Sequence, residues 1–300
     1  MSKEVLQGRV ITAYGRHFIV KLEDGTTRQS YMKGKKTGVC VGDYVRIDLH
    51  GQEEARIEEV LPRQNLLYRS DEMRSKQFAA NVDQLFIVVA VQPVFSDDLL
   101  SRALVGAWSA NISPIIILNK IDLTEDYPTA KERLEAYVRL GVPVVETSTL
   151  DPAKLHTQLI PLLKGKTSLL LGQSAMGKSS ILNVLVPEAQ AHTQEHSVAL
   201  GTGKHTTTTT SLYELRDLQA SIIDSPGFQS FGLRHLTQAE VVQGFPEFSE
   251  YIPHCKFYNC THLHEPGCGV LQALKEGCIS TKRHQMYERI LKECTAPEKY

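Results

Sequence analysis

One short stretch, residues 169–180, constrains the fold of this chain more than any other. An apolar run ends at Gly172, four residues follow, and then come Gly177, Lys178 and Ser179, which completes the pattern G-x-x-x-x-G-K-S. In this pattern the glycines let backbone N–H groups point at an anion, and the helix that follows turns its positive end toward the same anion. The stretch therefore predicts a phosphate-holding loop between a buried strand and a helix.

Each part of this phosphate loop has an expected partner. The Lys178 ammonium would reach the β- and γ-phosphates of a nucleotide, and the Ser179 hydroxyl would bind Mg²⁺. A glycine-rich turn without function is the alternative, but it does not explain a strand, a loop and a helix in this order. The predicted nucleotide-binding residues of the loop are Gly172, Gln173, Ser174, Ala175, Met176, Gly177, Lys178, Ser179 and Ser180.

The chain before the loop alternates between apolar strands and helices. Residues 84–91 and 115–118 are continuous apolar runs, which are typical of strands buried on both faces. Helices are predicted over 97–111, 127–140 and 152–163, and a further strand over 142–146. This alternation predicts an α/β domain whose parallel sheet binds its ligand at the carboxyl ends of the strands.

The segment Asn119-Lys120-Ile121-Asp122 follows the 115–118 strand and is predicted to select guanine. The Asp122 carboxylate can accept hydrogen bonds from N1–H and the N2 amine of guanine, whereas adenine leaves it unpaired, a mismatch worth roughly 10⁴-fold. Asn119 would meet the acceptor edge of the base, and the aliphatic stem of Lys120 would cover its face. Ser148, in the stretch 147–149, would contact the base from the other side, or the stretch would only cap a helix.

Two segments after the loop are predicted to sense the γ-phosphate. The strand at 221–224 ends in D-S-P-G, so Asp224 would hold Mg²⁺ through water and the Gly227 N–H would face the γ-phosphate. The threonine run at 206–210 could be a linker; beside a nucleotide, one of Thr206–Thr208 would close over Mg²⁺, and Thr207 is our candidate.

The predicted catalytic residues are Lys178, Thr207 and His205. A glutamine that orients the attacking water often follows D-x-x-G, but here Phe228 takes that place. We therefore expect slow intrinsic hydrolysis and strong activation by a partner. His205 is the candidate water-positioning group, and an exposed histidine without a role is the alternative.

The first 65 residues predict a small β-barrel, SH3-like or OB-like, of about five short strands divided by turns. Residues 1–36 hold eight Lys/Arg against three Asp/Glu, although the whole chain has a net charge of −1. Nucleic-acid binding by this basic part and a purely structural barrel are both open. The polar residues 63–80 predict a linker. The candidates for phosphate contact are Arg9, Arg16, Lys33, Lys35 and Lys36.

Near the C-terminus the pattern C-x4-C-x-H-x5-C predicts a metal site. Its four ligands would form a tetrahedral zinc set without an open position, so the zinc would be structural. Reduced core cysteines beside an incidental histidine are the alternative, and His254, His264 and Cys278 are spare candidates. Helices are predicted over 270–276 and 280–294. The predicted zinc ligands are Cys255, Cys260, His262 and Cys268.

These motifs resemble those of translation-factor-type GTPases, but in a different order. In those proteins the phosphate loop comes first and N-K-x-D last, whereas here residues 119–122 precede the loop and 224–227 close the series. Such a circular permutation preserves strand adjacency, so the fold survives. It also turns the element after 227 into a domain exit that needs bracing.

Together with the barrel and the zinc set, this order resembles the RsgA family (YjeQ/YloQ type) of small ribosomal subunit biogenesis GTPases. The resemblance covers essentially the whole chain, and it departs at Ala175 and Met176, where the family usually has glycine and a small apolar residue. It implies an α/β fold with three parts: an RNA-binding OB-fold barrel at 1–65, a circularly permuted P-loop GTPase domain at 66–232, and a zinc-binding helical module at 233–300.

The resemblance also implies a function. It implies hydrolysis of GTP to GDP stimulated by the 30S ribosomal subunit, contacts with 16S rRNA, and a late role in subunit maturation and release of assembly factors. One structural Zn²⁺ per subunit and Mg²⁺ with GTP would be the cofactors. The alternatives are an RNA-binding assembly protein that uses GTP as a binding switch with little turnover, and an ATP-using enzyme.

We expect a cytoplasmic monomer that binds neither DNA nor membrane. The first residues lack an apolar signal region, and the most apolar stretch, 85–91, is far shorter than the roughly 20 residues of a membrane helix.

Overall fold

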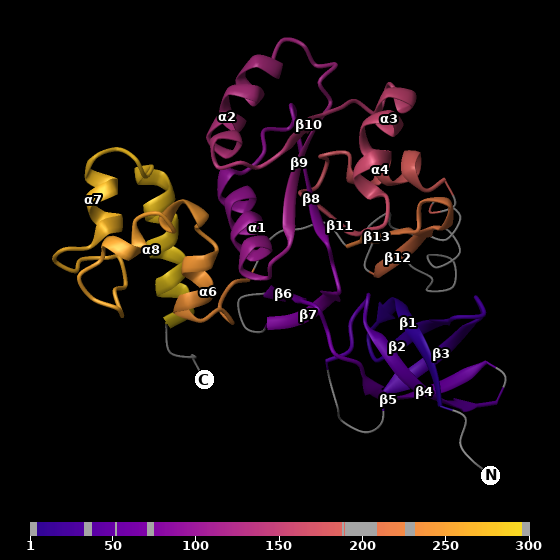
Figure 1. Ribbon diagram of the computed structural model, residues 1–300. Coiled ribbons are helices and arrows are strands. Elements are labelled where there is room, and N and C mark those ends of the chain that lie inside the picture. The colour runs from indigo at the N-terminus through magenta and orange to yellow at the C-terminus, as the bar shows by residue number, and fades with distance from the viewer. Residues whose placement is uncertain are drawn as a thin grey trace.

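The computed structural model describes residues 5–32, 38–51, 53–70, 75–187, 189, 209–225 and 232–295. Three parts can be seen in Figure 1: an α/β part at the top and centre, an indigo barrel below it, and a yellow helical part to the left of α1. Within the described residues, no helix combines the length and the apolar character that a membrane crossing requires.

Five strands form the N-terminal barrel. Their order is β1-β2-β3-β5-β4, and β4 pairs back with β1, which closes the barrel in the OB-like arrangement. Alternate side chains point inward, so Val10, Val20, Ile47 and Ile57 are fully buried. The five strands are β1 (Val5–Tyr14), β2 (His17–Leu22), β3 (Thr27–Met32), β4 (Tyr44–His50) and β5 (Glu54–Val60).

The central part is the predicted α/β domain. Its strands lie in the order β10-β9-β8-β11-β13-β12, and all are parallel except β12. The strands are β8 (Gln84–Ala90), β9 (Ser113–Asn119), β10 (Val144–Glu146), β11 (Thr167–Gly172), β12 (Thr210–Leu215) and β13 (Ala220–Asp224). Every residue of β8 and β11 is buried, as their continuous apolar runs predict.

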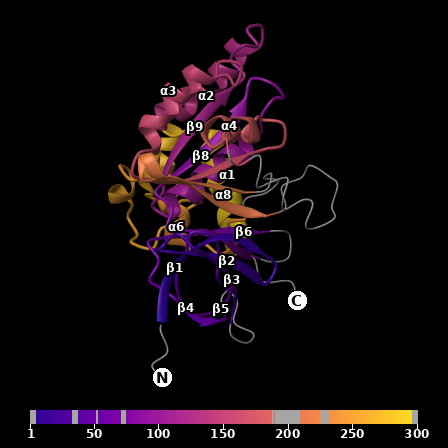
Figure 2. The ribbon, with the colours of Figure 1, turned by 90° about the vertical axis from the view of Figure 1, so that its right-hand side faces the viewer.

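Helices cover both faces of this sheet. In Figure 1, α1 and α2 lie on one side of β8 and β9, and α3 and α4 lie on the other. Both views place the barrel below the sheet (Figure 1 and Figure 2). Three of these helices match the predictions within two residues at each end: α1 (Asp97–Ser109), α2 (Tyr127–Arg139) and α3 (Pro152–Leu163). The fourth, α4 (Lys178–Leu185), begins where the phosphate loop predicts a helix.

The predicted linker at 63–80 is wrong. This stretch forms an antiparallel hairpin of β6 (Leu66–Ser70) and β7 (Ser75–Ala80). Tertiary contacts outweigh its polar composition. Ala79 forms a β-bridge with Val41, and Arg63 Nε and Nη2 each lie 2.7 Å from an oxygen of the buried Asp43 carboxylate. The hairpin is thereby fixed to the barrel.

The barrel and the α/β sheet are joined through their backbones. Strand β12 pairs with β1, with Thr12 opposite Ser211, so one sheet of eleven strands runs through both parts. The Arg9 guanidinium donates to Thr167 Oγ1 at 2.9 Å and to Ser221 Oγ at 3.2 Å.

The expected phosphate contact of Arg9 is therefore wrong. Its side chain is committed to the start of the strands β11 and β13, and burial lowers its pKa. Arg16 is exposed, as expected, while Lys33, Lys35 and Lys36 lie outside the described residues.

The C-terminal part packs against α1. It contains α6 (Gln238–Gln243), α7 (Gly269–Lys275) and α8 (Thr281–Thr295), the last two as predicted. Arg102 on α1 holds both carboxylate oxygens of Glu293 at 2.9 Å, and Ser109 donates to the Glu240 carbonyl at 2.8 Å. These contacts supply the brace that the permuted domain exit requires.

Candidate nucleotide site and metal centre

The predicted phosphate loop connects β11 to α4 and has no room for side chains at its two glycines. Gly177 has φ +88°, and a Cβ there would lie 2.1 Å from Asn119 Nδ2. A Cβ on Gly172 would lie 2.9 Å from the Val88 carbonyl oxygen. Ala175 also takes a left-handed conformation, with φ +66°, at the position where the resemblance predicts glycine.

The N-K-I-D segment contacts this loop directly. The Asn119 side chain is fully buried, and its Nδ2 donates to the Met176 carbonyl at 2.9 Å. The Lys120 ammonium donates at 2.8 Å to the carbonyls of Ala175 and Gln92. The predicted base-recognition segment and the predicted phosphate loop therefore form one structure, although more than 50 residues separate them in the chain.

The second base segment lies beside the first. The Ser148 hydroxyl donates to Asp122 Oδ1, and the Ile121 N–H donates to the Thr147 carbonyl at 3.3 Å. Among the described residues, Asn119 Oδ1 and Thr147 Oγ1 are buried polar atoms that have no hydrogen-bond partner. Unpaired buried atoms of this kind are expected where a polar ligand is to bind.

The loop lysine lies on the aspartate of D-S-P-G. The Lys178 ammonium donates to Asp224 Oδ1 and, at 2.7 Å, to the Ser225 carbonyl, and all three residues are buried. Burial raises the pKa of Asp224, even though the charge of Lys178 opposes this rise. A cation and an acidic oxygen thus meet at the edge of the phosphate loop, which fits a site for phosphate and Mg²⁺.

The remaining predicted residues of the loop lie around this pair. The Gln173 side chain accepts a hydrogen bond from the Ser96 N–H at 2.8 Å, which fixes the loop to the start of α1. Ser174, Ser179 and Ser180 are exposed, the last two in the first turn of α4. Thr207, His205 and Gly227 lie outside the described residues.

Sequence reasoning missed two contacts that shape the site. The carbonyl of Gln92 accepts from Lys120, and the carbonyl of Ser225 accepts from Lys178. Backbone carbonyls carry no sequence signal.

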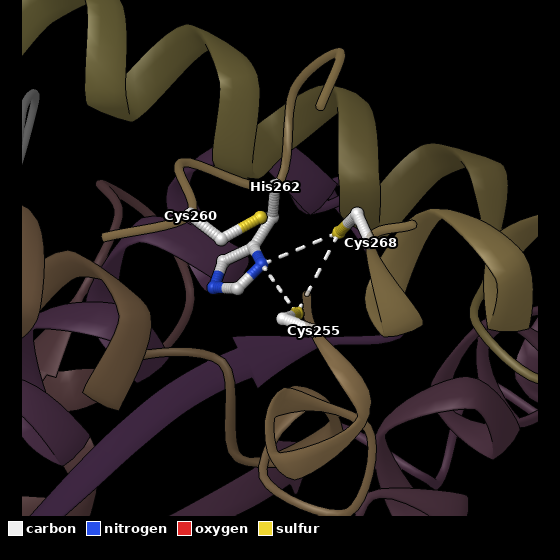
Figure 3. Close-up of side chains that lie close together, drawn as sticks. All are labelled: Cys255, Cys260, His262 and Cys268. Atoms are coloured by element: carbon white, nitrogen blue, oxygen red, sulfur yellow. Dashed lines mark hydrogen bonds between the residues drawn. The ribbon is translucent and has the colours of Figure 1, made fainter. Parts of the chain in front are cut away.

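The predicted zinc ligands come together in the C-terminal part (Figure 3). The ligand atoms of Cys255, Cys260, His262 and Cys268 all lie within 4.8 Å of one another. His262 Nδ1 lies 3.6 Å from Cys255 Sγ and 3.5 Å from Cys268 Sγ, and these two sulfurs are 3.9 Å apart. In a tetrahedron with Zn–S bonds of about 2.3 Å, sulfurs are separated by about 3.8 Å, so the cluster fits a metal of this size.

The protonation chemistry of the cluster also suits a metal. Burial lowers the pKa of His262, so the imidazole stays neutral, and raises the pKa of Cys260 to about 12. A cation is therefore needed to hold the thiolate form that binds metal. His254, His264 and Cys278 do not join the cluster, and no second group of this kind occurs among the described residues.

Hydrogen bonds stabilise the loop that carries the predicted metal ligands, residues 255–268. The Glu265 carboxylate accepts hydrogen bonds from the N–H groups of Thr261, Leu263 and His264 and from the Thr261 hydroxyl. Partial burial raises the pKa of Glu265, but these bonds outweigh it and hold the pKa well below its usual range. His284 Nε2 donates to the His262 carbonyl at 2.8 Å, which fixes the ligand loop on α8.

Comparisons with known proteins agree with this geometry. A sequence model described as RsgA GTPase matches residues 60–234. The chain is 59% identical over its full length to the small ribosomal subunit biogenesis GTPase RsgA of Bordetella pertussis, and all of that protein is covered. It is 51% identical to the protein of the same name from Burkholderia pseudomallei, over 97% of this chain and 93% of that one.

Two solved structures are similar over nearly the whole chain. YjeQ from Thermotoga maritima is 29% identical, with a TM-score of 0.72 over 98% of this chain and 100% of its own. YloQ, described as a circularly permuted GTPase, is 29% identical, with a TM-score of 0.68 over 97% and 95% of the two chains. The permuted order of the motifs, the barrel and the Cys₃His cluster all agree with these matches, and the chain belongs to the RsgA GTPase family.

Proposed function

We propose that this protein is a GTPase of small ribosomal subunit biogenesis that binds the 30S subunit and hydrolyses GTP to GDP late in its maturation. Release of assembly factors would follow hydrolysis, and the contacts with the subunit would include 16S rRNA. The names of the relatives support the process. The observation that carries the nucleotide chemistry is the junction of Asn119 and Lys120 with the phosphate loop beside the Lys178–Asp224 pair.

Guanine would bind where the two base segments meet. The Asp122 carboxylate, oriented by the Ser148 hydroxyl, would accept from the N1–H and N2 amine of the base. Asn119, Lys120 and Ile121 would contact the rest of the ring. Since Lys120 also holds the loop through Ala175, base binding and phosphate binding would stabilise each other.

The phosphates would lie on the loop from Gly172 to Ser180. The Lys178 ammonium, which now lies on Asp224, would neutralise charge on the β- and γ-phosphates as the bond to the leaving oxygen breaks. Ser179 and Thr207 would hold the Mg²⁺, with Asp224 binding it through water, and the cation would neutralise phosphate charge. A water molecule would attack the γ-phosphorus, with His205 as the candidate for orienting it and the Gly227 N–H facing the transferred group.

The cysteine cluster would hold one structural Zn²⁺ per chain. Three thiolates and one imidazole leave no open position for a substrate, so the metal would stabilise the C-terminal part and take no part in hydrolysis. The chain continues from the predicted γ-phosphate sensor, residues 224–227, into this part, so the nucleotide state would be transmitted to it. We expect the protein to act as a cytoplasmic monomer, with the barrel and the C-terminal part gripping RNA together.

The decisive experiment measures GTP turnover with and without isolated 30S subunits. We expect slow turnover by the protein alone and a large increase when subunits are added. The Lys178→Ala variant should show no such increase. Asp122→Asn should lower the preference for GTP over ATP. If subunits bind the GTP-loaded protein without raising turnover, the alternative of a binding switch holds. His205→Ala tests the water-positioning role, which fails if stimulated turnover is unchanged.

A further inference from the structure

The loop between the first two cysteine ligands exposes two aromatic rings. Its four residues are Lys256, Phe257, Tyr258 and Asn259. The relative exposure of Tyr258 is 104% and that of Phe257 is 40%, so nothing in the described chain covers the tyrosine ring. Aromatic side chains usually bury most of their surface, and exposure of this degree marks a surface that meets a partner.

This aromatic tip, residues 256–259, is held rigidly. Both flanking cysteines belong to the metal cluster (Figure 3). The Lys256 N–H donates to the Gly267 carbonyl at 2.9 Å, and the Cys260 N–H donates to the Phe257 carbonyl at 3.3 Å. A surface that is fixed before binding loses little conformational entropy when a partner binds.

The charge around the tip favours a polyanion. The Lys256 ammonium lies 5.6 Å from the centroid of the Phe257 ring. Glu265 is the only acidic residue between Cys255 and Cys268, and its carboxylate is turned inward, onto four donors of the loop itself. Phosphates would therefore meet a cation and no competing carboxylate on this loop.

We propose that Phe257 and Tyr258 form a stacking platform for an unpaired RNA nucleotide, with Lys256 on the adjacent phosphate. This inference rests on the proposed function, which supplies RNA as the partner. Exposed aromatic rings beside a cation bind single-stranded RNA because every base has a π-face, whereas the bases of a duplex are not available for stacking. In Figure 1 the C-terminal part lies to the left of the sheet and the barrel lies below the sheet, so the tip would contact a different RNA segment from the barrel.

The test uses the full-length protein with zinc bound and two probes, a 12-nucleotide oligouridylate and an RNA duplex of the same length. Tyr258→Ala is expected to weaken oligouridylate binding by roughly 5- to 150-fold, the range for loss of one stacked base. Tyr258→Phe should bind like the wild type because the ring remains. Leu150→Ala is the matched control, since Leu150 is 79% exposed and lies outside the C-terminal part.

A second readout follows stacking directly. Tyr258→Trp places an indole at the tip, and its fluorescence should be quenched by oligouridylate but not by the duplex, after subtraction of the wild-type signal from Trp108. Unchanged oligouridylate affinity in Tyr258→Ala, or no quenching, overturns the proposal. Loss of 30S binding with intact oligouridylate binding also overturns it, because the tip would then contact a ribosomal protein.

Failure of the proposed function gives a different result. In that case wild-type protein would show no turnover response to 30S subunits, while the comparison of oligouridylate with duplex would still report on the tip.

Discussion

Replacing Gly177 by alanine tests whether the base segment and the phosphate loop are one structure. The backbone of Gly177 has φ +88°, which costs an L-residue about 1–2 kcal/mol. The new Cβ would also lie 2.1 Å from Asn119 Nδ2. Because Asn119 is fully buried, its amide cannot swing into solvent to relieve the clash.

The two costs add at this position. Displacing the Asn119 amide breaks its hydrogen bond to the Met176 carbonyl and leaves buried polar atoms unpaired, which costs about 1–3 kcal/mol. We expect Gly177→Ala to lower the free energy of unfolding by about 2–5 kcal/mol in total. Affinity for a fluorescent GDP analogue should also fall, because the displaced amide belongs to both the base site and the loop.

Gly165→Ala is the matched control. Gly165 has a similar φ of +70°, but nothing lies within 4 Å of its missing Cβ, so only the backbone cost of about 1–2 kcal/mol applies. The comparison uses urea unfolding of both variants, together with Gly177→Ala in an Asn119→Ala background. The proposed clash is refuted if Gly177→Ala lowers the free energy of unfolding no more than Gly165→Ala does. It is also refuted if the extra loss persists in the Asn119→Ala background, where no amide is left to clash with the new Cβ.

Three further outcomes are expected. Chelation of the reduced protein should release one zinc per chain and lower the melting temperature. The variant Cys278→Ser, whose changed residue lies outside the cluster, should keep the zinc and the melting temperature of the wild type. Metal analysis that finds no stoichiometric zinc contradicts the assignment. The pKa of Glu265 in the folded protein lies below its unfolded value, so the stability that the ionised carboxylate contributes is complete above about pH 4.3 and is lost as the pH falls. The difference in melting temperature between the wild type and Glu265→Gln should therefore become smaller when the pH is lowered in a series of melting experiments. Arg9→Met should lower the free energy of unfolding by about 1.5–3 kcal/mol, whereas Arg16→Met should hardly change it because Arg16 is exposed. Equal effects of the two substitutions would mean that the hydrogen bonds of Arg9 contribute nothing.

The α/β part could be predicted closely because its signals are local and strong. Strands β8 and β11 read as unbroken apolar runs, and the start of α1 carries a cap, Ser96, whose hydroxyl accepts from the Leu99 N–H. The Cys₃His cluster could be predicted from spacing alone, since its four residues lie within a stretch of 14 residues. Short separations leave the chain few ways to arrange them.

Features that depend on distant contacts could not be predicted. The hairpin of β6 and β7 lies in a stretch of mainly polar composition, and its support comes from Arg63 and Asp43, 20 residues apart. Arg9 looked like a phosphate contact because its charge was visible and its burial was not; its partners Thr167 and Ser221 lie more than 150 residues away. Basic residues in a sequence indicate that a chain can bind phosphate groups, but packing decides whether each charged side chain lies on the surface or on a partner inside the protein.

The pairing of β1 with β12 has a consequence for the order of events on the translating ribosome. The barrel can close as soon as β5 has left the exit tunnel, yet the end of β1 also pairs with β12, which begins at Thr210, about 150 residues after β5 ends at Val60. At ordinary synthesis rates that interval lasts roughly 8–30 s. During this time the end of β1 offers an unpaired strand edge, the kind of surface on which nascent chains associate wrongly. The short register of this pairing, Thr12 and Ala13 only, keeps that exposed edge small.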